Sequence, residues 1–184
     1  MAVVLMVCGL AACGSGGDAD NTSDLAYIQN KGTLIVGVTV YEPMNYQTAD
    51  GKWTGFDTEY AEAVAEKLGV EAQFVIIDWD NKYTELDARS IDCIWNGMTI
   101  TEEGRLNASI TDPYVENAQV VVMANDRLAD YPDAASMQDL TFAVETGSAG
   151  ETEATNAGFK HVTVVAAHAS SCPDVAAGPA ARCL

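Results

Sequence analysis

The chain has 184 residues, of which 48% are hydrophobic, and its 27 acidic residues outnumber 9 basic ones for a net charge of −18. This apolar fraction suffices for packed cores and excludes wholesale disorder, while the negative surface repels phosphates and excludes a nucleic-acid partner. The five cysteines form no CxxC pair and are accompanied by two histidines, so we expect no metal and no cofactor.

The N-terminal residues have the pattern of a bacterial export signal. The apolar run within residues 1–13 is too short to span a bilayer and ends on small residues, although no basic residue precedes it. Its end, Leu10-Ala11-Ala12-Cys13, resembles a lipoprotein lipobox, which implies lipidation of Cys13. Residues 14–24, rich in Gly, Ser and Asp, would then form a flexible tether. The alternative is an ordinary signal peptide with an incidental cysteine.

Strands and helices alternate over residues 25–124. Apolar, β-branched runs predict strands at Leu34–Val40, Gln73–Ile77 and Ile91–Trp95. Between them, Asp57 is expected to cap a helix that ends at Leu68 before Gly69, and a shorter helix is expected over residues 80–88. This order predicts a parallel, doubly wound α/β sheet as a first lobe.

A second lobe begins further along the chain. Gln119–Met123 is predicted as another strand, followed by a polar crossing. A strand at Thr141–Val144, a helix from about Glu151 and a strand at Val162–Val165 then form a new unit. We therefore assign residues 125–168 to a hinge crossing and the start of a second α/β lobe.

The predicted strand ends carry groups that suit a ligand. In doubly wound sheets, ligands bind beyond the carboxyl ends of the strands. Gly97 allows close backbone approach and Thr99 offers a hydroxyl. Helix starts at Thr101 and Ser148 offer N–H groups suited to a carboxylate. Each feature also has a structural explanation, since Asn-Gly favours a turn and both hydroxyl residues are ordinary helix caps.

Several blocks in order carry a family resemblance: GTLIVGVTVYEPMNY, GKWTGFDTEYAEAVAEKLGV, IDWDNKYTELDARSIDCIWNGMTIT and DPYVENAQVVVM. They closely resemble the extracellular solute-binding proteins of polar amino-acid ABC importers, family 3, from about Lys31 to Lys160. The resemblance implies a periplasmic-binding-protein type II fold of two doubly wound lobes that close about a hinge.

The resemblance also implies a set of ligand-binding residues: Tyr41, Phe56, Asn96, Gly97, Thr99, Arg105, Thr146 and Ser148. Phe56 is either a cleft aromatic or a core residue ahead of the helix. Many family members place a carboxylate-binding arginine three residues after the threonine, whereas here Gly104 stands there and Arg105 follows. That offset turns the side chain by roughly 100° on a helix, so Arg105 either reaches the ligand or faces solvent.

The last residues depart from the family pattern. The segment HASSCPDVAAGPAARCL loses the strand–helix alternation and gains prolines and cysteines. We therefore expect residues 169–184 to be a non-native tail from a truncation or frameshift, which leaves the second lobe incomplete; the alternative is a genuinely short, divergent tail.

The function that the resemblance implies is capture of a free amino acid outside the cytoplasm and its delivery to an ABC importer permease. The protein would be a monomer held at the membrane by its lipid anchor, periplasmic or at the cell surface, without a catalytic residue. Three alternatives stay open: a dehydratase-like enzyme on the same scaffold with an acid such as Glu102 as base, a ligand-sensing module, and a non-functional fragment.

Overall fold

The computed structural model describes residues 23–166 and 180–183. Its helices are α1 Asp24–Lys31, α2 Phe56–Leu68, α3 Lys82–Asp87, α4 Glu102–Asn107 and α5 Ala149–Asn156, with 3-10 turns η1 Trp79–Asn81 and η2 Asn125–Asp130. Its strands are β1 Thr33–Val38, β2 Tyr46–Gln47, β3 Trp53–Thr54, β4 Glu71–Ile76, β5 Cys93–Ile94, β6 Val121–Val122, β7 Thr141–Glu145, β8 His161–Val165 and β9 Ala180–Cys183. Among the described helices, none has the length and apolar character needed to cross a membrane.

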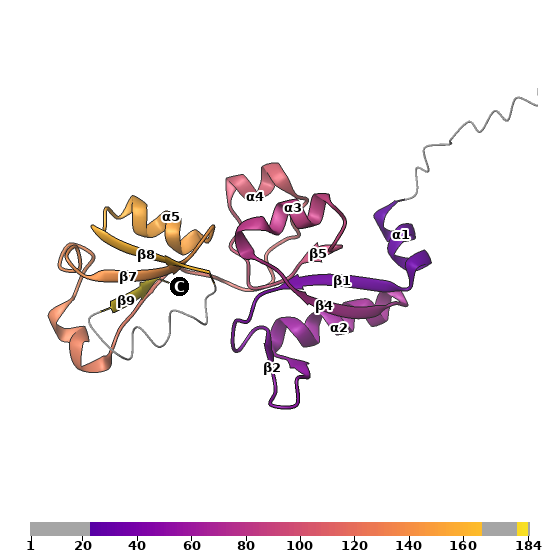
Figure 1. The fold of residues 1–184 in the computed structure, drawn as a ribbon, viewed down its shortest axis with the longest axis horizontal. Helices are drawn as coiled ribbons and strands as arrows, with labels where there is room; N and C mark the ends of the chain where they lie inside the picture. Colours follow the sequence, from indigo (N-terminus) through magenta and orange to yellow (C-terminus); the bar gives the residue numbers. More distant parts are fainter. Residues whose placement is uncertain (1–22, 167–179, 184) are drawn as a thin grey trace, which may run out of the picture.

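Two α/β lobes are joined by a crossing segment (Figure 1). In the first lobe, β1 pairs in parallel with β4 on one side and β5 on the other. Leu34 and Val36 of β1 pack with Ala61 of α2, whereas Ile35 points to the other core, which includes Leu86 of α3. This alternation buries both faces of the sheet, as a doubly wound fold requires. The predicted parallel α/β sheet is confirmed.

Helix α2 begins differently from the prediction. Its N-cap is Gly55, with φ of 120°, and Asp57 is a helical residue, so the predicted cap at Asp57 is wrong. The reason is tertiary: a side chain at Gly55 would collide with the Pro43–Met44 backbone, and the Asp57 N–H bonds to the Met44 carbonyl. The end of the helix is as predicted, because Gly69 lies in the left-handed region with φ of 76°.

The second lobe is built on the sheet β6-β9-β7-β8. Strand β7 runs parallel to both β8 and β9, while β6 is antiparallel to β9. Its core is centred on Phe142, which stacks on Phe159 with 3.9 Å between ring centroids. Because β6 belongs to this sheet, residues 121–122 lie with the second lobe rather than the first, to which we assigned them from the sequence.

Part of the sequence-based assignment falls outside the described residues. This holds for the export signal, for Cys13 and for most of the tether. Within the predicted non-native tail, the backbone of Ala180–Cys183 forms β9 beside β7, and residues 169–179 are not described.

Candidate ligand-binding site

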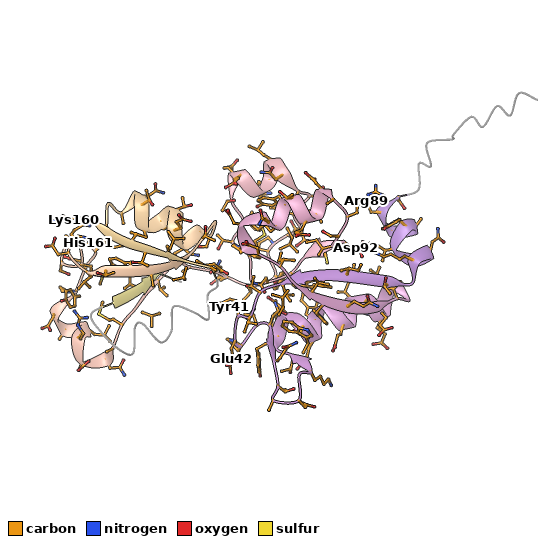
Figure 2. All side chains as sticks on the ribbon, in the orientation of Figure 1. Tyr41, Glu42, Arg89, Asp92, Lys160 and His161 are labelled. Atoms are coloured by element: carbon orange, nitrogen blue, oxygen red, sulfur yellow. The ribbon has the colours of Figure 1, made fainter. Side chains whose placement is uncertain are left out.

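A pocket lies beyond the carboxyl ends of the first-lobe strands, where they face the loop that follows β7. It has a volume of about 110 Å³ and receives residues from the first lobe, the crossing segment and the second lobe. Figure 2 shows Tyr41, which lines it, where the first lobe faces the second, whereas Asp92 lies at the opposite end of the first sheet. This is the position where doubly wound sheets bind ligands.

A buried amide network supports the pocket floor. The Asn96 Oδ1 accepts hydrogen bonds from the Thr39 backbone N–H at 2.9 Å and from Asn45 Nδ2 at 3.0 Å. Its Nδ2 donates to Thr39 Oγ1 at 2.6 Å. Asn45 is fully buried and also accepts from the Thr58 hydroxyl of α2. Asn96 therefore joins the ends of β1 and β5 to α2, and its side chain is occupied by protein partners.

The backbone after this network is shaped for close approach. Gly97 has a φ of 57°, and an added Cβ would lie 3.1 Å from Cε1 of Tyr41. A larger residue would be strained by the left-handed backbone and would press on the Tyr41 ring. The loop thus needs glycine for two independent reasons, and its backbone lines the pocket beside the aromatic ring.

The Thr99 hydroxyl is directed by two amides. Its Oγ1 accepts from Asn117 Nδ2 at 2.6 Å and from Gln119 Nε2 at 3.2 Å. A hydroxyl oxygen has two acceptor positions and one proton to donate. With both acceptor positions in use, Thr99 is left as a donor, which suits an anionic or carbonyl oxygen. Asn117 and Gln119 also line the pocket, and neither was predicted from the sequence.

The second lobe contributes the start of α5. Ser148 is its N-cap, and the Ser148 Oγ accepts from the Glu151 N–H at 3.2 Å. The Glu151 carboxylate accepts from the Gly147 N–H at 2.8 Å, one residue before the cap. The loop is therefore held by hydrogen bonds to its own helix, and Ser148, Ala149 and Gly150 line the pocket. First-turn N–H groups carry partial positive charge.

The charged residues of the pocket include Lys82, Glu103 and Glu145. Lys82 and Glu145 are buried, with exposed fractions of 7% and 6%. Burial lowers the pKa of Lys82, and the carboxylates of Glu103, Asp80 and Glu145 counteract this. Lys82 was not predicted from the sequence, although it follows the end of β4, where the strand-end rule applies as well.

Not every predicted residue meets the pocket. Tyr41, Asn96, Gly97, Thr99 and Ser148 line it, but Phe56, Arg105 and Thr146 do not. Phe56 is 53% exposed and packs against Tyr60 and Tyr114. Arg105 is exposed on α4, and the Thr146 N–H bonds to the Val165 carbonyl of the neighbouring strand.

The described residues include no group of three or more His, Cys, Asp or Glu side chains that could hold a metal ion. Cys93 lies in the first-lobe core, where burial raises the pKa of its thiol to about 12 and keeps it protonated.

The fold has counterparts among known proteins. The model of bacterial extracellular solute-binding proteins, family 3, matches residues 34–164. The chain belongs to this family. Members of this family of solute-binding proteins work outside the cytoplasm, and the fold is the periplasmic-binding-protein type II fold.

Individual relatives and one solved structure support this match. The chain is 34% identical over 168 residues to the L-cystine-binding protein TcyA of Bacillus subtilis, covering 86% of this chain and 61% of TcyA. It is 39% identical over 88 residues to the L-cystine-binding protein TcyJ of Escherichia coli, covering 47% of this chain and 33% of TcyJ. A crystal structure of the ancestral amino acid-binding protein AncCDT-1, a precursor of cyclohexadienyl dehydratase, superimposes with a TM-score of 0.84 at 29% identity, covering 88% of this chain and 74% of that one. The chain thus spans less than two thirds of the length of these curated relatives.

Proposed function

We propose that this protein binds a free amino acid between its two lobes and delivers it to the permease of an ABC importer. The observation that carries the proposal is the combination of hydrogen-bond donors and carboxylates in one small polar pocket. A free amino acid carries a carboxylate and an ammonium group on one carbon, and this pocket offers partners for both.

The carboxylate partners come from both lobes. The Thr99 hydroxyl is left as a donor by its two amide neighbours, and the first residues of α5, whose N–H groups are helix N-terminal donors, also line the pocket. For the ammonium group, Glu103 and Glu145 supply carboxylates, and Tyr41 supplies an aromatic wall. Of the residues suggested by the sequence, the proposal retains Tyr41, Gly97, Thr99 and Ser148 as ligand contacts, with Asn96 as their support.

The size of the pocket favours a single small solute. Its volume of about 110 Å³ is below the range of roughly 300 to 1,000 Å³ that is usual for drug-sized ligands. We propose binding without turnover, because capture and release need no bond to be broken. The curated relatives named above are L-cystine-binding proteins, so L-cystine is the first amino acid to test.

Export and anchoring complete the proposal. The apolar N-terminal run and the lipobox-like Leu10-Ala11-Ala12-Cys13 support secretion and lipidation at Cys13, with the protein acting as an anchored monomer outside the cytoplasm. Mass spectrometry of the membrane fraction from a bacterial host tests this: a diacylglyceryl-modified N-terminal cysteine is expected, and an unmodified, freely secreted chain contradicts it.

A thermal-shift panel tests the binding function. The full chain is heated with each of the twenty standard L-amino acids and with L-cystine. At about 100 times its dissociation constant, a specific ligand adds about 2.7 kcal/mol to the free energy of unfolding, which raises Tm by roughly 5 to 10 °C for a chain of this size. A folded protein whose Tm responds to none of these compounds would contradict the proposal.

A further inference from the structure

We propose that Lys82 is the cation that binds the carboxylate of the ligand and that the same side chain ties ligand capture to the closed arrangement of the lobes. This inference rests on the proposed function and adds to it the residue that recognises the carboxylate.

Lys82 bridges the two lobes. It is the first residue of α3, in the first lobe, and its Nζ donates to the Trp79 carbonyl of the same lobe at 3.1 Å. The same Nζ donates to the Gly147 carbonyl of the second lobe, also at 3.1 Å. The rings of Trp79 and Tyr83 each lie 4.9 Å from the ammonium nitrogen and hold it in place. Separation of the lobes would break the bond to Gly147 and expose the ammonium to water.

The ammonium retains one donor for a ligand. A lysine Nζ carries three N–H groups, and the described residues accept two of them. Lys82 lines the pocket together with the Thr99 hydroxyl and with Ala149 and Gly150 of the α5 N-terminus. Donors from both lobes therefore surround one space, and a carboxylate has the lone pairs to accept from all of them.

Lys82 places a positive charge at the pocket, which Arg105 does not. Among the described residues that line the pocket, Lys82 is the one with a cationic side chain. Arg105 is exposed and lies outside the lining. The preceding residue, Gly104, is buried, and an added Cβ would lie 3.0 Å from Tyr83 Oη and 3.1 Å from Ile110 Cδ1. A long side chain at that position would therefore have to displace its neighbours.

The surrounding acids favour the charged form of Lys82. Asp80, Glu103 and Glu145 interact electrostatically with its ammonium group and raise its pKa against the lowering effect of burial. A buried cation is costly unless it is compensated. Two carbonyls, two aromatic rings and these carboxylates supply that compensation in the structure, and a ligand carboxylate would add to it.

The experiment compares an amino acid with its α-carboxamide, which has the same shape but lacks the negative charge. Calorimetry on the full chain uses the amino acid that stabilises the wild type most and the matching carboxamide. The variants are Lys82→Gln, Lys82→Arg and Arg105→Gln, with Lys67→Gln as a control for loss of an exposed lysine outside the pocket. We expect the wild type to prefer the acid at least tenfold. Lys82→Gln should weaken binding of the acid about 10- to 100-fold and remove that preference.

The remaining variants decide the assignment. Lys82→Arg should retain a preference for the acid, and both Arg105→Gln and Lys67→Gln should bind like the wild type. A preference that survives in Lys82→Gln, or one that is lost in Arg105→Gln, overturns the inference but leaves the binding function intact. A wild type that binds no amino acid overturns both. If circular dichroism shows that Lys82→Gln is unfolded, Lys82→Met replaces it, because methionine keeps the buried aliphatic stem. Equal binding of the acid and the carboxamide by the wild type would overturn the inference without any variant.

Discussion

The Tyr114 hydroxyl donates a hydrogen bond of 2.9 Å to the Asp57 carboxylate, across 57 positions of the chain. Asp57 is fully buried in the first turn of α2, and Tyr114 belongs to the segment that leads towards the second lobe. A Cβ added to Gly97 of the pocket would lie 3.8 Å from Asp57 Oδ2. One buried carboxylate therefore connects the start of α2, the pocket backbone and the crossing segment.

This carboxylate should make stability depend on pH. Burial raises the pKa of Asp57 above its usual value of 3.8, and hydrogen bonds from Tyr114 and the Gly97 backbone partly offset the effect. The folded protein therefore holds the proton more tightly than the unfolded chain. The resulting stabilisation is fully present below pH 3.8 and is lost as pH rises through the folded-state pKa.

Comparing the wild type with Asp57→Asn separates the pH dependence of stability that is due to Asp57 from the contributions of the other acidic residues. Urea unfolding at a series of pH values should show the wild type gaining stability relative to Asp57→Asn as the pH falls from 7 towards 4. Tyr114→Phe removes a hydrogen bond that lowers the Asp57 pKa, so the gain should begin at a higher pH. A gain in the opposite direction, with rising pH, would show that the Asp57 pKa is depressed.

The amide network under the pocket should contribute strongly to stability. Asn45 donates to the Trp95 carbonyl at 2.9 Å and to Asn96, and it accepts from Thr58. Asn45→Ala would remove one hydrogen-bond partner from each of these three groups and should lower the free energy of unfolding by about 2 to 4 kcal/mol. The exposed Asn156→Ala serves as the control, with an expected change within about 0.5 kcal/mol. Equal effects of the two substitutions on urea unfolding would refute this role for the network.

Alanine substitutions at two glycines of the second lobe can distinguish the effect of backbone strain from the effect of a clash between the lobes. Gly147 and Gly158 have φ values of 64° and 72°, so alanine at either should cost about 1 to 2 kcal/mol. A Cβ at Gly147 would lie 2.6 Å from Asp80 Oδ1 and 3.1 Å from Asp80 Cα, across the lobes, whereas a Cβ at Gly158 meets nothing within 4 Å. Gly147→Ala should therefore lose the ligand-induced rise in Tm that Gly158→Ala retains. If both variants respond to ligand alike, close approach of the lobes at Gly147 is not needed for binding.

Local patterns determined much of the fold. The runs of β1 and β7 were predictable because strands buried on both faces need continuous apolar sequence. Those of β4 and β8, which are partly exposed, were predictable from their β-branched residues. Gly69 was predictable as a helix end because the left-handed region favours glycine. The strand-end rule brought Gly97, Thr99 and Ser148 to one pocket. The ordered blocks of family sequence were sufficient to indicate the family that the comparison established.

Other features depend on contacts between distant segments, and only the tertiary structure decided them. A short apolar run such as Val121–Val122 does not reveal which sheet it joins. Asp57 has the residue type of a helix cap, but its carboxylate meets Tyr114 instead. Lys82 reads as an ordinary helix residue until the second lobe places the Gly147 carbonyl against it. Sequence patterns predict the secondary structure of a segment and the face it buries in its own lobe, because periodicity and capping are local. Which side chains meet across a cleft depends on how two lobes pack, and no local pattern encodes that.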